Sequence, residues 1–144
     1  MSKFFPFKPT NPGQIVRMTR TTVELAANVS VTAGRPAVLS GGYYREPAVG
    51  VATLSGVRGR FTDTVSNVGG AAGAKTVQVD FYHEFQVIWL NNDTTDPVAK
   101  TDRGTQCYWT GPLTVGADSD SDANSVAGEV FDVSGNYVGV KLEA

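Results

Sequence analysis

Covalent catalysis by this chain would depend on its single histidine, His83, and its single cysteine, Cys107. A nucleophile–histidine–acid set would have to combine His83 with Cys107 or with a serine, because the histidine must take a proton from the attacking group. The sequence has no Gly-x-Ser-x-Gly motif, and Cys107 stands between Gln106 and an aromatic pair, unlike a catalytic cysteine. We therefore expect His83 to lie in an exposed turn and Cys107 to be a small buried hydrophobic residue.

Other common reaction chemistries also lack a pattern in this sequence. A pair of carboxylates could be drawn from its 14 acidic residues, but any chain this acidic allows such a choice. There is no phosphate-binding loop, no dinucleotide motif and no Cys/His cluster. We expect a protein that is not an enzyme and has no cofactor.

An acidic stretch has the ligand spacing of a calcium-binding loop. Oxygen-bearing side chains stand at alternate positions and a glutamate follows at the twelfth place: Asp118, Asp120, Asp122, Asn124 and Glu129. The sixth place is Ala123, where such a loop needs glycine for its sharp turn, and neither flank favours a helix. We interpret the stretch as a solvated acidic turn and keep a bound cation as the alternative.

The elements that carry these residues have the periodicity of β-strands. Apolar or alternating runs recur at spacings of about 8 to 12 residues between Gly, Pro, Ser and Asn, which is typical of a sandwich or barrel. Strands are predicted over 21–25, 29–32, 37–39, 48–54, 57–61, 76–81, 84–90, 106–110, 125–133 and 137–142. The last two form a predicted hairpin, and the glycine-rich segment 64–75 favours a loop. We predict an all-β, mostly antiparallel fold, a single sandwich or barrel domain over residues 21–144, with Trp89 and Trp109 packed in its core.

The first 20 residues are predicted to form an extended arm that contacts a partner. Three prolines restrict the backbone there, and three phenylalanines could each gain on the order of 2 kcal/mol on burial, either on their own domain or in a neighbour. The arm could also add a strand to a neighbouring sheet. The candidate partner-binding residues are Phe4, Phe5, Phe7, Lys8, Ile15, Arg17 and Arg20.

Charge is distributed unevenly along the 144 residues, although the net charge is only −2. Residues 1–60 contain eight basic and two acidic side chains, whereas residues 61–144 contain four basic and twelve acidic ones. Such polarity favours docking between copies or onto a partner. The basic residues are scattered, so we expect no direct nucleic-acid binding. The start is unlike a signal peptide and no apolar run is long enough for a membrane span, so we expect a soluble protein made in the cytoplasm, with no membrane partner.

Two groups of short segments, each group containing glycine and valine, follow one another in the sequence. The first group covers 46–52 and continues through 56–61, and the second covers 104–109, 113–115, 124–130 and 137–142. This order resembles the capsid cement, or head decoration, proteins of tailed bacteriophages. Glu129 stands where an apolar residue is commoner in that family, and the segment 80–97 is longer and more aromatic.

The resemblance implies an all-β structural protein on the outer capsid surface of a virion, synthesised in a host bacterial cytoplasm. Its partners would be the major capsid protein and copies of itself, as a homotrimer, and it would clamp neighbouring capsomers. The alternative function is a phage tail, fibre or host-surface-binding module. Such a module would bind bacterial glycans or proteins through exposed aromatic residues, with Tyr43, Tyr44, Trp89 and Trp109 as candidates.

Overall fold

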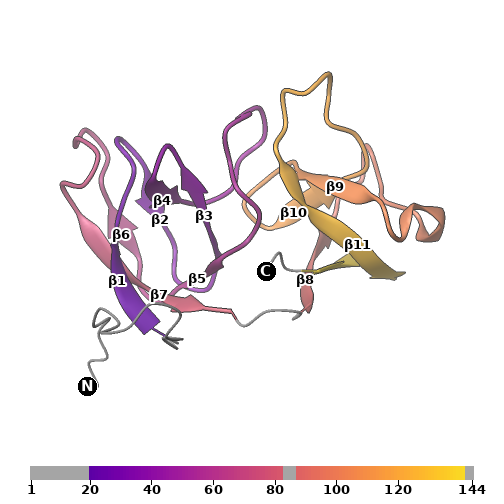
Figure 1. Ribbon diagram of the computed structural model, residues 1–144, viewed down its shortest axis with the longest axis horizontal. Coiled ribbons are helices and arrows are strands. Elements are labelled where there is room, and N and C mark those ends of the chain that lie inside the picture. Colours follow the sequence, from indigo (N-terminus) through magenta and orange to yellow (C-terminus); the bar gives the residue numbers. More distant parts are fainter. Residues whose placement is uncertain (1–19, 83–86, 142–144) are drawn as a thin grey trace, which may run out of the picture.

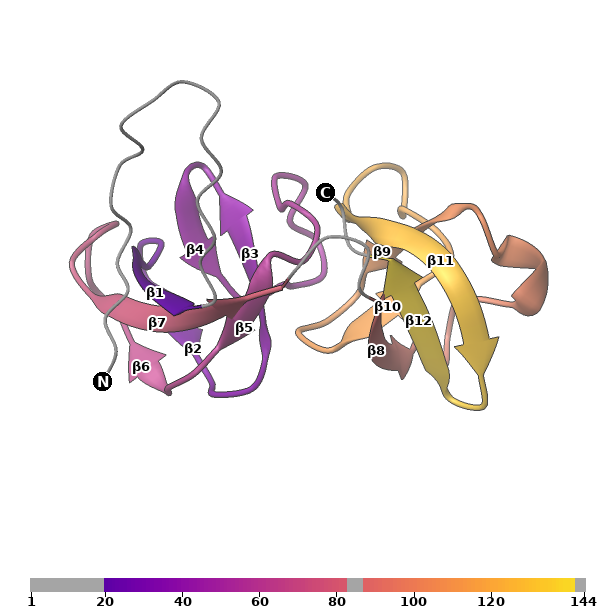
Figure 2. The same cartoon turned by 60° about the horizontal axis from the view of Figure 1, so that its bottom comes forward.

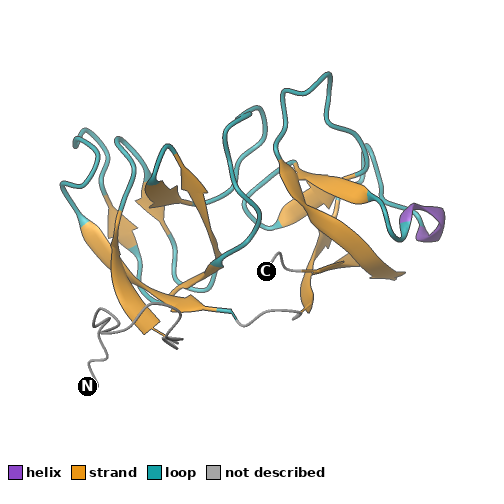
Figure 3. Ribbon diagram, viewed as in Figure 1, coloured by secondary structure: helices purple, strands orange, loops and turns teal. Residues whose placement is uncertain are grey.

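The computed structural model describes residues 20–82 and 87–141, and these residues confirm the predicted all-β fold (Figure 1). The strands are β1 (Arg20–Glu24), β2 (Ser30–Val31), β3 (Pro36–Ser40), β4 (Tyr43–Arg45), β5 (Gly59–Phe61), β6 (Val65–Ser66), β7 (Thr76–Phe81), β8 (Val87–Asn92), β9 (Gln106–Trp109), β10 (Thr114–Gly116), β11 (Val126–Ser134) and β12 (Tyr137–Lys141). One short 3-10 helix, η1 (Lys100–Asp102), is the single helical element of the described ranges (Figure 3). It is far too short to cross a membrane.

The amino-terminal half is a curled five-stranded sheet in the order β1-β7-β5-β3-β4, with antiparallel neighbours. Its two edges nearly meet, because Leu25 forms a parallel bridge with Tyr44. The backbone N–H of Ala26 also donates to the carbonyl oxygen of Tyr44 at 2.9 Å. The short strands β2 and β6 pair with each other beside this sheet.

The carboxyl-terminal half is a closed barrel in the order β10-β8-β12-β11-β9. Four of its pairs are antiparallel, and the closing pair, β10 with β8, is parallel. The barrel lies beside the amino-terminal sheet in both views (Figures 1 and 2). Closure leaves this half without a free strand edge, which removes a surface prone to pairing with another chain.

The two halves share one topology, which the local strand patterns of the sequence do not reveal. Strands β1, β3, β4, β5 and β7 of the first half correspond to β8, β9, β10, β11 and β12 of the second. Each neighbour relation is repeated, including the parallel contact between the first and third strands of each set. We call the halves the amino-terminal and carboxyl-terminal barrels; the first is a curled sheet whose edges are joined by the Leu25–Tyr44 bridge, and the second is closed by strand pairing.

The correspondence extends to individual residues. Gly34 donates its N–H to the carbonyl oxygen of Phe61 at 2.8 Å, and Gly104 does so to Val130 at 2.9 Å. Both glycines are in the left-handed region, with φ of 89° and 88°. In each barrel a Val-x-Gly-x-Phe/Val sequence follows, and its central glycine, Gly59 or Gly128, has no room for a Cβ atom. The sequences 57–61 and 126–130 lie 69 positions apart, and this recurrence was the available sequence signal.

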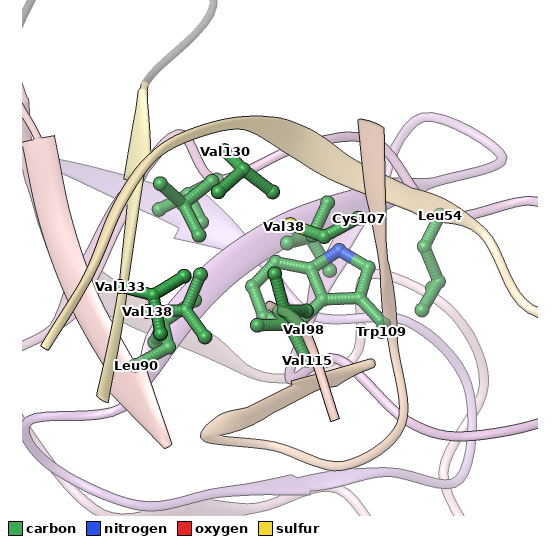
Figure 4. Packing of buried hydrophobic residues seen from close by; sticks show 13 residues of the cluster. Val38, Leu54, Leu90, Val98, Cys107, Trp109, Val115, Val130, Val133 and Val138 are labelled. Carbon is green, nitrogen blue, oxygen red and sulfur yellow. The ribbon is translucent and has the colours of Figure 1, made fainter. Parts of the chain in front are cut away.

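The core has two clusters, and the larger one joins the barrels. It contains residues from the carboxyl-terminal barrel together with Val38, Leu54 and Val57 of the amino-terminal half (Figure 4). Trp109 is fully buried in this cluster, and its indole N–H donates to the carbonyl oxygen of Ser55 at 3.1 Å. The predicted core positions of Trp109 and Cys107 are therefore confirmed.

The predicted strand over 48–54 is wrong, because this segment is a loop with turns. Its backbone groups bond to side chains of the other barrel instead of a neighbouring strand. Ser125 Oγ accepts from the N–H of Leu54 at 2.8 Å and donates to the carbonyl oxygen of Val51 at 2.5 Å. Asn124 Oδ1 accepts from the N–H of Gly50 at 2.7 Å. The loop thus fastens the two barrels together.

Other strand predictions agree closely with the structure. Strand β7 has the predicted bounds 76–81, and β11 and β12 form the predicted hairpin around Gly135. The predicted strand over 84–90 is seen as β8 from Val87 onward, while 84–86 lie outside the described residues. The segment 64–75 consists of turns around the two-residue strand β6.

Candidate functional site

Most of the predicted partner-binding residues lie outside the described part of the chain: Phe4, Phe5, Phe7, Lys8, Ile15 and Arg17. The described one, Arg20, begins β1 and already has a partner within the chain. Its Nε and Nη2 donate to the carboxylate of Asp80 at 2.5 and 2.9 Å. The hydrogen bond from Arg20 lowers the pKa of Asp80. Arg20 therefore supports the β1–β7 pair in addition to any external contact.

Of the two residues singled out for covalent chemistry, the structure describes Cys107 alone. His83 lies outside the described residues. Cys107 is fully buried on β9, and its Sγ lies 3.5 Å from the carbonyl oxygen of Gly128. Burial raises the pKa of the Cys107 thiol to about 12, so the thiolate needed for nucleophilic attack is scarce at neutral pH.

The acidic stretch 118–129 does not gather its oxygen ligands. Asn124 uses its Oδ1 to hold Gly50, and Glu129 points outward from β11. Asp120 and Asp122 lie in a turn whose residues have positive φ. Within 20–82 and 87–141, no three His, Cys, Asp or Glu side chains converge on a position that could hold a metal ion.

The candidate surface aromatics divide into buried and exposed residues. Tyr43 and Tyr44 are half-buried, and Tyr44 packs edge-to-face on Phe81 with ring centroids 5.9 Å apart. Trp109 is buried, but Trp89 is 48% exposed, so the predicted core position of Trp89 is wrong. The apolar run at 87–90 hides the strand alternation, which directs Leu90 inward and Trp89 outward.

Three exposed aromatic side chains stand on adjacent strands of the carboxyl-terminal barrel. Trp89 on β8, Phe131 on β11 and Tyr137 on β12 are 48%, 56% and 54% exposed. Trp89 is opposite Gly139, and Tyr137 lies two residues before Gly139, which places it on the same face of β12. Phe131 is the extra residue of a β-bulge. We call these three residues the aromatic wall.

Trp89 lies flat against its neighbouring strand. Three adjacent atoms of the six-membered ring would be 3.0–3.1 Å from a Cβ atom placed on Gly139. Such nearly equal distances mean that the ring face, rather than the ring edge, covers Gly139. The absence of a side chain at Gly139 makes room for the indole and leaves the opposite ring face toward solvent.

A polar row borders the aromatic wall. Lys141, two residues after Gly139, is opposite Glu129, and Glu129 is opposite Gln106. All three side chains are exposed. They contribute to a cavity of about 420 Å³ whose lining is Gly104, Thr105, Gln106, Val126, Gly128, Glu129 and Lys141. This volume is within the range of small-ligand pockets.

The amino-terminal barrel provides an internal comparison for the wall. By strand register, Thr22 of the amino-terminal barrel is equivalent to Trp89, and Thr76 is equivalent to Tyr137. Thr62 is equivalent to Phe131, because each directly follows the last residue of the Val-x-Gly-x-Phe/Val sequence. Three threonines therefore stand where the carboxyl-terminal barrel has three aromatic residues. Since the same topology accepts threonine at these positions, folding alone does not require the aromatic side chains.

Comparisons of this chain with known protein families, with curated proteins and with solved structures found no match.

Proposed function

We propose that this chain is a non-catalytic structural virion protein that binds the outer surface of a bacteriophage capsid and stabilises it. The family resemblance of its glycine–valine motifs supports the choice of partner. The structural observation that carries the proposal is the inequality of the two barrels, which share a topology but differ in charge and in the character of their outer surface.

The charge difference is large for such similar units. Residues 20–82 have six basic and four acidic side chains, whereas residues 87–141 have three basic and eight acidic ones. A molecule with a basic end and an acidic end approaches a charged surface in a preferred orientation. Lys3, Lys8 and Arg17 precede this basic end in the sequence. In the proposed function this end attaches to the capsid and the carboxyl-terminal barrel projects from it.

Binding to capsids of the source phage that lack decoration tests the proposal directly. The full chain is expected to co-sediment with these capsids to saturation and to raise their resistance to heat. Raising the salt concentration to about 1 M should weaken the attachment, because the Debye length falls from about 8 Å to about 3 Å. Absence of the chain from purified virions, together with no capsid binding, would contradict the proposal.

A variant lacking residues 2–13 tests whether the arm contributes to attachment. It should occupy capsids less fully than the full chain while its β fold stays intact, because the described strands begin only at Arg20. Far-ultraviolet circular dichroism and thermal unfolding provide the control for folding. Full occupancy by this variant would remove the arm from the proposal.

The exposed face of Trp89 favours a second function, that of a host-surface-binding module on a tail or fibre. Electron cryo-microscopy of purified particles distinguishes the two, since the chain would then lie on the tail rather than on the capsid shell.

A further inference from the structure

We infer that the aromatic wall and the polar row beside it form a carbohydrate-binding surface for hexopyranose units of a bacterial surface polysaccharide. The inference rests on the second, host-surface-binding function and names its ligand class, and it concerns the barrel opposite to the end proposed to meet the capsid. Its residues are all described, and they come from strands β8, β9, β11 and β12.

The orientation of Trp89 is the first reason. An aromatic residue that anchors a protein interface usually fills a pocket of the partner. The indole of Trp89 instead lies flat on Gly139 and presents a planar face. Aromatic faces are electron-rich and attract weakly positive C–H groups, which one side of a pyranose ring offers in a flat array.

The size of the exposed aromatic surface is the second reason. A buried aromatic residue covers about 150–250 Å², so three residues that are half exposed present about 300 Å². A stable protein interface needs about 800 Å² from each partner. The aromatic wall is too small for a stable dimer to depend on it, but it matches a few sugar rings.

The polar row is the third reason. The row places three kinds of polar group beside the aromatic wall and along the cavity of about 420 Å³. These are the amide of Gln106, the carboxylate of Glu129 and the ammonium group of Lys141. Sugar hydroxyl groups both donate and accept hydrogen bonds, so a mixed set of donors and acceptors suits them. A few polar groups beside an apolar platform are also what fixes the orientation of a small ligand.

The internal comparison is the fourth reason. At the positions of Trp89 and Gly139 the amino-terminal barrel has Thr22 and Gln78, and at the position of Lys141 it has Asp80, which is paired with Arg20. The amino-terminal barrel therefore lacks both the aromatic wall and a glycine at the position equivalent to Gly139. The sequence differences between the barrels at the positions of Trp89, Gly139 and Lys141 thus lie next to one another on the same surface.

Binding to an array of bacterial surface polysaccharides and peptidoglycan fragments tests the inference, followed by titration of the tryptophan fluorescence of the full chain. Trp109 is buried, so a ligand-dependent change in emission and reduced quenching by acrylamide would report on Trp89. The variants Trp89→Thr and Tyr137→Thr install the residues of the amino-terminal barrel. Each should weaken binding by about tenfold or more. Thr22→Ala, at the position equivalent to Trp89, is the matched control and should leave binding unchanged.

The remaining outcomes separate this inference from the proposed function. Capsid occupancy of Trp89→Thr should equal that of the unaltered chain. If no polysaccharide on the array binds, or if Trp89→Thr binds as well as the unaltered chain, the inference is wrong. If Trp89→Thr instead abolishes capsid binding or self-association, the aromatic wall is a protein interface and the inference is likewise overturned. Thermal unfolding of Trp89→Thr verifies that a loss of binding is not a loss of folding.

Discussion

At the scale of single residues, Cys107 shows how burial suppresses chemistry. The apolar surroundings raise the pKa of its thiol from 9.0 to about 12. We expect a thiol reagent such as dithionitrobenzoate to label the native protein at neutral pH only as fast as it opens, and the denatured protein at once. Because the unfolded thiol ionises first, the free energy of unfolding should fall as the pH rises from about 9 towards 12. Rapid labelling of native protein would contradict the buried position.

A substitution at the same residue tests the equivalence of the barrels. Cys107 is opposite Gly128, as Ala37 is opposite Gly59. Cys107→Ala installs the residue of the amino-terminal barrel, so we expect a loss of only about 1 kcal/mol in unfolding free energy. Denaturant titration measures it. Cys107→Leu, which adds volume to a closed core, should cost more, about 1–3 kcal/mol.

At the scale of elements, the paired strands depend on two glycines that allow close approach. A Cβ atom on Gly128 would lie 2.7 Å from Val140 Cγ1 and 2.8 Å from the carbonyl oxygen of Lys141. Gly128→Ala should therefore lower the unfolding free energy by about 2–3 kcal/mol, and Gly59→Ala should do the same in the other barrel. Gly111→Ala is the control, because its nearest contact would be an ordinary 3.5 Å. A loss no larger than that of the control would mean that the strands can move apart cheaply.

The sequence was sufficient to predict strands whose pattern is local. Alternation marks β7, and glycine with asparagine marks the β11–β12 turn. It was insufficient for the segment 48–54, because an apolar run there has the pattern of a strand. The hydrogen bonds that hold this segment as a loop come from Asn124 and Ser125, more than 70 positions later in the sequence. The aromatic wall was hidden for a related reason. Trp89 stands in a continuous apolar run, and only the register with Gly139 shows which face it occupies.

At the scale of the whole molecule, two barrels of equal topology behave as one folding unit only if their contact is strong. The larger core cluster contains residues of both, and Trp109 bonds to Ser55 across the contact. We therefore expect a single cooperative unfolding transition in calorimetry, with equal calorimetric and van't Hoff enthalpies. Two separate transitions would mean that each barrel unfolds independently.

Ser125 is the residue whose removal should separate the barrels most directly. Ser125 is 6% exposed. Its hydroxyl accepts a hydrogen bond from the N–H of Leu54 and donates one to the carbonyl oxygen of Val51. Ser125→Ala leaves these two backbone groups of the loop without their partner, at a cost of about 1–3 kcal/mol for each buried group that stays unsatisfied. This loss of stability weakens the contact between the barrels and leaves the hydrogen bonds within each barrel unchanged. Calorimetry of Ser125→Ala should accordingly show a broader or split transition, whereas the exposed control Thr101→Ala should unfold like the unaltered chain. A sharp, unshifted transition in Ser125→Ala would show that the apolar contacts of Val38, Leu54 and Val57 are sufficient to couple the two barrels.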